Sequence, residues 1–190
     1  MEQSLAVTTA SPRMLRVHLL PWLLPLSLCL GAALGTYFGY RPVSVLPEQI
    51  LLISGADIGG ESILRVFCLY AVPCFAAGLL SATLFGFFLI PLLFFLRGFL
   101  FSFSAASIML SGASAGSACL LLGAPALFSF FALFLLGEEA FCSSLDIYRT
   151  CRGYPRIRFS LISADRFLLA VLLNFAAAAV RVFLIPPLLK

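Results

Sequence analysis

The sequence predicts an all-α fold, a polytopic transmembrane helical bundle with about five spans and a cytoplasmic N-terminus. Hydrophobic residues make up 62% of the chain and charged residues 11%, whereas soluble domains carry roughly 25% charged residues. The mean hydropathy is +1.11. Apolar runs of about 20 residues, the length that crosses a bilayer, recur along the chain. A single integral membrane domain covering residues 1–190 follows from these observations.

The apolar runs place the spans in order, near residues 17–40, 63–85, 88–110, 118–137 and 167–186. The first run is longer than the core of a cleaved signal peptide, so we expect it to be retained as a span. Residues 63–111 form one apolar stretch that fits two helices with a tight turn near Gly86. Helices that are broken or re-entrant within the protein are the alternative for this stretch.

The charge distribution predicts the orientation of the spans. The net charge is +4, and Arg13 and Arg16 precede the first span. A basic loop, 138–166, follows four crossings and carries five arginines: Arg149, Arg152, Arg156, Arg158 and Arg166. The positive-inside rule puts both clusters in the cytoplasm and the acidic loop 41–62 outside. Basic clusters also occur in nucleic-acid-binding proteins, but here the membrane explains them and no nucleic-acid partner is expected.

Small residues at four-residue spacing line one face of each of the first two spans. Such a face lets another helix backbone approach closely, so these faces are expected to contact protein instead of lipid. The two sets are Gly31, Gly35 and Gly39 in the first span and Gly78, Ala82 and Gly86 in the second.

Arg97 lies near the middle of the third span, where an arginine costs about 2.5–3.5 kcal/mol. The surrounding Leu, Ile and Phe residues offset this cost, but the guanidinium still needs protein, water or headgroups around it. Three interpretations remain: pairing with Glu138 or Glu139, snorkelling about two turns toward the cytoplasmic headgroups, or binding an anionic substrate.

Two further polar residues lie in the fifth span. Asn174 is expected to form an interhelical hydrogen bond, and Arg181 is expected to snorkel at the outer end.

Catalytic constellations are sparse. The "GEEAF" segment holds adjacent Glu138 and Glu139, as in CAAX-type intramembrane proteases, but their arginine position is Ser143 and no histidine follows His18. The six cysteines lack metal-ligand spacing and are interpreted as structural. We therefore expect a non-enzymatic protein without cofactor or metal. A small transporter or channel subunit is the alternative, indicated weakly by a serine stripe, Ser102, Ser104, Ser107 and Ser111.

The segment "FGFFLIPLLFFLRGFLFSFSAASIM" resembles the central helical pair of the stage II sporulation protein M (SpoIIM) family. The family's "[LF]-[KRN]-G-[FL]" element corresponds to Leu96, Arg97, Gly98 and Phe99, after Pro91. The following "ACLLLGAPALFSFFALFLLGEEAF" resembles the next family span. The short N-terminus and the abundance of Phe and Ala depart from the family pattern.

This resemblance implies a membrane scaffold for engulfment during endospore formation, in the bacterial cytoplasmic membrane. It would act there with other membrane or cell-wall-remodelling proteins, which handle peptidoglycan. Under this hypothesis the small-residue faces and the outer loop 41–62 recruit the partners.

Overall fold

The computed structural model describes residues 12–40, 62–110, 116, 122–152 and 163–184, with side chains from Trp22 onward. The predictions about loop 41–61, about His18 and about the arginines at positions 13, 16, 156 and 158 concern residues or side chains outside this described part.

The described part is all α-helical, which confirms the predicted fold class. Five helices are long and apolar enough to cross a membrane, so the protein is an integral multi-pass membrane protein. The helices are α1 (Pro12–Gly39), α3 (Ile63–Ser81), α4 (Gly86–Leu110), α6 (Ala124–Cys151) and α7 (Ala164–Ala179), and α7 continues as a π-helical turn, η2 (Val180–Leu184).

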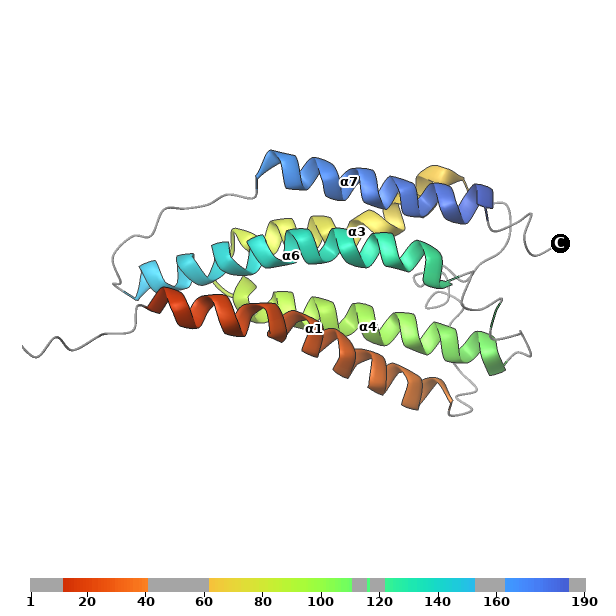
Figure 1. Cartoon of the computed structure of the whole chain (residues 1–190), viewed down its shortest axis with the longest axis horizontal. Coiled ribbons are helices and arrows are strands. Elements are labelled where there is room, and N and C mark those ends of the chain that lie inside the picture. Colours follow the sequence, from red (N-terminus) through yellow and green to blue (C-terminus); the bar gives the residue numbers. More distant parts are fainter. Residues whose placement is uncertain (1–11, 41–61, 111–115, 117–121, 153–162, 185–190) are drawn as a thin grey trace, which may run out of the picture.

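The helices alternate in direction along the bundle, as Figure 1 shows. The first residues of α1, α4 and α7 lie at one end, together with the last residues of α3 and α6. We call this the Gly86 end and the opposite one the Leu110 end. Five antiparallel passes therefore bring the start of α1 and the end of α6 to the same side, as the charge distribution requires.

The apolar stretch 63–111 contains two helices joined by a tight turn, not a broken or re-entrant helix. Ser62 caps α3 by accepting a hydrogen bond from the backbone N–H of Arg65 at 3.4 Å. The helix ends at Ser81, and the N–H of Thr83 donates to the Leu80 carbonyl in the turn. Gly86 then begins α4.

This turn corrects the second small-residue face. Gly78 is half-buried in α3, Ala82 is exposed as the C-cap residue, and Gly86 is buried at the start of another helix. The four-residue spacing counts along one continuous helix, so it loses its meaning where the helix ends. The three residues do not share a packed face.

The first small-residue face packs directly on α4. A Cβ atom added to Gly31 or Gly35 would collide with the carbonyl oxygens of Phe95 and Phe99, and one on Gly39 would lie 2.7 Å from the Ala106 Cβ. From the other side, a Cβ on Gly98 would meet the Leu28 carbonyl. The backbones of two parallel helices thus touch along a glycine seam. Because glycine has no side chain, the two backbones approach closely and make extensive van der Waals contact.

The core lies between α3, α4, α6 and α7, and Leu24 of α1 contributes to it. Ile90 and Phe94 of α4 are fully buried against Leu133, Leu136 and Ala140 of α6. The Phe94 ring fills the space that a side chain at Gly137 would take, since a Cβ added to that glycine would lie 2.5 Å from the ring. The contact between the Phe94 ring and the Gly137 backbone therefore determines how α6 packs against α4.

The structure also corrects the basic loop 138–166. Helix α6 continues through residues 138–151, so the loop between α6 and α7 is confined to residues after Cys151. A helix of 28 residues is about 42 Å long, longer than the roughly 30 Å hydrocarbon core. Glu138 and Glu139 lie about 21 and 22 Å from the first residue of α6, so they are inside this helix and do not mark its end.

Candidate functional site

Arg97 projects from α4 into a recess shared with α3 and α6. Its Nη2 donates a hydrogen bond to the Ser129 hydroxyl of α6 at 3.4 Å, and its Cζ lies 5.7 Å from the centroid of the Tyr70 ring on α3. A guanidinium over an aromatic face gains a cation–π attraction. Its Nε is buried and has no hydrogen-bond partner among the described residues. These residues thus leave donors of this cation unsatisfied.

The guanidinium points toward the Leu110 end. Ser129 follows the first residue of α6, Ala124, by five positions, so the hydrogen bond lies about 7.5 Å below the start of that helix. Snorkelling toward the Gly86 end, the predicted cytoplasmic side, is therefore wrong. The side chain extends the other way because Tyr70 and Ser129 supply the polar and aromatic surface there.

Pairing of Arg97 with the two glutamates is also wrong. Glu139 pairs with Arg166 of α7 instead, with 3.1 Å between Oε1 and the arginine Nε. Glu138 is exposed on the surface of α6. Both glutamates lie nearer the Gly86 end than Arg97 does, beyond Gly137, which already sits opposite Phe94.

A second arginine approaches Tyr70 through its hydroxyl group. Nη1 of Arg181, on η2, donates to the Tyr70 hydroxyl at 3.4 Å. Arg181 is 8% exposed, so the expectation that it snorkels freely at the outer end is wrong. Two guanidinium groups from different helices therefore contact one buried tyrosine.

The recess itself has a charged floor and apolar walls. Its lining consists of Tyr70, Arg97, Phe101, Leu122 and Ala126. The ring of Phe101 is held edge-to-face by Phe130 of α6, at 5.3 Å between centroids. Among these lining residues, the Arg97 guanidinium is the charged group, and the apolar walls supply no side-chain acceptor for it.

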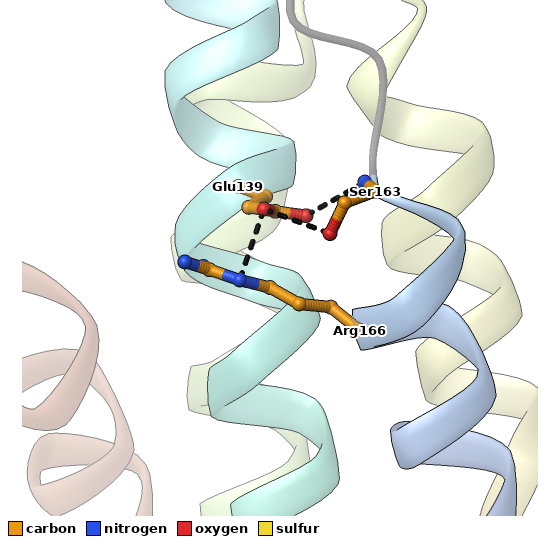
Figure 2. Close-up of polar contacts among 3 residues, drawn as sticks. All are labelled: Glu139, Ser163 and Arg166. Carbon is orange, nitrogen blue, oxygen red and sulfur yellow. Dashed lines mark hydrogen bonds and ion pairs between the residues drawn. The ribbon is translucent and has the colours of Figure 1, made fainter.

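A separate polar cluster joins α6 to the start of α7, as Figure 2 shows. The backbone N–H of Ser163 donates to Glu139 Oε2 at 3.2 Å, and its hydroxyl donates to Oε1 at 3.4 Å. Arg166, in the first turn of α7, completes the cluster. Glu139 thus satisfies an N–H at the beginning of a neighbouring helix and places negative charge at the positive end of its dipole.

Glu138 points away from this cluster. It lies on the same face of α6 as Leu127 and Phe131, which are 72% and 58% exposed. The hydroxyl of Ser144, six residues later, donates to the Thr83 carbonyl in the turn at the Gly86 end. Glu138 is therefore about 9 Å deeper than that turn, on a surface that otherwise presents apolar side chains.

Asn174 forms the interhelical hydrogen bond expected of it. Its Nδ2 donates to Cys74 Sγ of α3 at 3.3 Å and to the Ala170 carbonyl of its own helix at 2.9 Å. The amide is 1% exposed, and its Oδ1 has no hydrogen-bond partner in the described part of the chain. The residue thus contributes one contact between α7 and α3 at the cost of one unsatisfied acceptor.

The serine stripe does not line a polar path where the structure describes it. Ser104 and Ser107 donate their hydroxyls to the carbonyls of Leu100 and Phe103 on their own helix, at 2.8 and 2.9 Å. This back-bonding accommodates serine within a membrane helix. Ser111 lies outside the described residues.

Several residues of these clusters escaped the sequence analysis. Tyr70, Ser129 and Ser163 form contacts with Arg97 or Glu139 over 24 or more residues of separation, so local spacing carries no signal for them. The one signal for Tyr70 was a phenol inside an apolar run.

Comparison with known proteins finds no matching family model, no matching curated protein and no matching solved structure.

Proposed function

We propose that this protein is a non-enzymatic membrane scaffold that holds a partner membrane protein against the exposed face of α6. The observation that carries the proposal is Glu138, an exposed carboxylate within a helix long and apolar enough to span the membrane. A carboxylate facing lipid is costly, and ionisable residues in spans usually face protein or water. A basic side chain from a partner helix would remove this cost.

The surface around Glu138 supports the same proposal. Phe131 and Leu127 supply exposed apolar area two and three turns away, which a partner helix would cover by side-chain packing. The glycine seam of α1 is already occupied by α4. Partner recruitment is therefore assigned to the α6 face, and the Gly31, Gly35 and Gly39 face keeps an internal role.

The specific form of this function is a stage II sporulation protein M-like role in engulfment, with peptidoglycan-remodelling proteins as partners. It rests on the Leu96–Phe99 element. Gly98 of that element packs against α1, and this close packing explains why a residue without a side chain occupies the position. The transporter alternative has less support, because Ser104 and Ser107 bond to their own helix.

A photo-crosslinking residue at position 131 tests the scaffold in native membranes of sporulating cells. We expect a cross-linked adduct whose protein component is a membrane or cell-wall-remodelling protein, and at least a fivefold loss of adduct in the Glu138→Gln variant. The matched control carries the same crosslinker at Leu172, an exposed position on α7. Equal adducts with and without Glu138 would overturn the scaffold proposal, and solute flux in proteoliposomes of the protein alone would favour the transporter.

A further inference from the structure

The recess at Arg97 has room for about one water molecule, and the guanidinium that lines it has donors available for an anion at its opening. A guanidinium carries five N–H donors and no acceptor, yet within the described structure Arg97 makes one hydrogen bond, at the long distance of 3.4 Å, and its Nε makes none. A buried donor without a partner loses its hydration and gains nothing in return. Of the two carboxylates expected to neutralise it, Glu139 is held by Arg166 and Glu138 is exposed on the surface of α6.

Among the described residues, the other charged side chain at Tyr70 is also an arginine. Arg181 reaches the hydroxyl of Tyr70 while Arg97 lies over the face of the same ring. A buried cation in a low-dielectric region is stabilised by a neighbouring anion, and Tyr70 and Arg181 supply none. The arrangement therefore favours binding of negative charge over binding of a neutral or cationic group.

The position of the recess along the membrane normal indicates which anions can reach it. Helix α4 has 25 residues and is about 37 Å long, so its ends extend a few ångströms beyond a core of roughly 30 Å. The hydrogen bond to Ser129 lies about 7.5 Å below the start of α6. The guanidinium thus lies about one and a half helical turns from the start of α6, on the Leu110 side of the bundle, where lipid phosphates of the interface are the nearest abundant anions.

We propose that Arg97 binds a phosphate group at the Leu110 end of the bundle. The planar fork of arginine matches two phosphate oxygens at once, and Nε with one Nη is the pair of donors that the structure leaves for them. The apolar walls, Phe101, Leu122 and Ala126, suit the neighbouring glycerol or acyl carbons of a phospholipid. Free phosphate offers the same oxygens from the aqueous side.

The test uses the full-length protein in nanodiscs, in two arms. In the first arm, nanodiscs of phosphatidylcholine with phosphatidylglycerol are followed by native mass spectrometry of the released protein. In the second arm, nanodiscs of phosphatidylcholine alone are titrated with inorganic phosphate against chloride, and the thermal unfolding midpoint is measured. The variants are Arg97→Leu, Arg97→Lys and Ala126→Val. The matched control is Arg152→Gln, an exposed arginine at the opposite end.

We expect the wild type and Arg152→Gln to retain one phosphatidylglycerol, with at least a fivefold loss in Arg97→Leu and a smaller loss in Arg97→Lys. Stabilisation by phosphate but not chloride, without lipid retention, would identify free phosphate as the source. If Arg97→Leu does not fold, Ala126→Val keeps the charge while narrowing the recess and should lose binding on its own. Equal lipid retention and equal phosphate response in the folded variants and the wild type would overturn the site.

Discussion

Arg166 Nε lies 3.1 Å from Glu139 Oε1, and this ion pair ties the first turn of α7 to the side of α6. The same carboxylate accepts two hydrogen bonds from Ser163, the N-cap residue of α7. Helix α7 has 16 residues before its π-helical turn, so its attachment at this end determines how it packs against the bundle. Glu139 makes the polar contacts at this end of α7, beside the apolar packing of Phe167 and Ala170.

Glu139→Gln should therefore destabilise the bundle, and its neighbour offers the control. Arg166 is about half exposed, so the ion pair itself contributes less than about 1 kcal/mol. The weakened hydrogen bonds to Ser163 add about 1 kcal/mol. We expect a total loss of about 1–2 kcal/mol in the free energy of unfolding, measured by denaturation in mixed micelles. Glu138→Gln, one residue away, should leave it unchanged, and equal losses in both variants would contradict this assignment.

Gly35→Leu should separate α1 from α4. The leucine Cβ would lie 3.0 Å from the Phe99 carbonyl carbon, and its oxygen is nearer still, so backbone must move. Overpacking of this kind costs about 1–3 kcal/mol or more. Ala33→Leu puts the same side chain at an exposed position of the same helix and should be tolerated. Cross-linking of cysteines placed at Tyr40 and Met109, whose side-chain ends touch, with a short bifunctional maleimide measures the separation. Unchanged cross-linking in Gly35→Leu would refute the seam.

Substitutions of Asn174 test whether the stability of the bundle requires its amide group. Asn174→Leu removes the bond to Cys74 together with the unsatisfied Oδ1, and these two effects oppose each other. The free energy of unfolding should change by less than about 1 kcal/mol, because single hydrogen bonds between membrane helices average about 0.6 kcal/mol. Asn174→Asp has nearly the same shape but buries a carboxylate, and it should cost several kcal/mol. A large loss in Asn174→Leu would show that the amide has a role beyond this contact.

The sequence predicted the number and order of the helices because hydropathy over about 20 residues is a property of the local chain. It also placed the turn near Gly86, where two crossings had to meet. It misplaced the end of α6, because Glu138 and Glu139 resembled a membrane boundary. In the structure α7 begins beside Glu139, and the Ser163 N–H at that point donates to the Glu139 carboxylate. The two residues are far apart in sequence, so no local pattern predicts this contact.

The sequence could not predict toward which membrane surface the Arg97 side chain extends, for a related reason. The choice between two membrane surfaces depends on which surface offers acceptors and aromatic faces, and Tyr70 and Ser129 come from other helices. The small-residue spacing identified α1 as a packing helix but not α4 as its neighbour. Ala82 was assigned to a face because the end of α3 at Ser81 lies inside an unbroken apolar run.

The orientation of the bundle is the claim on which the outer position of the Arg97 recess and the cytoplasmic position of Arg152 both depend. Cys151 is free and exposed at the last residue of α6, which makes it a native reporter. We would retain Cys151, replace the other five cysteines with alanine, and place Ser62→Cys in a second variant as the reporter for the Leu110 end.

The decisive measurement is labelling of these two thiols in intact cells with a membrane-impermeant maleimide. The account predicts that the thiol at position 62 reacts before permeabilisation and that Cys151 reacts after it. Labelling of Cys151 in intact cells, with position 62 protected, would invert the bundle and contradict the account.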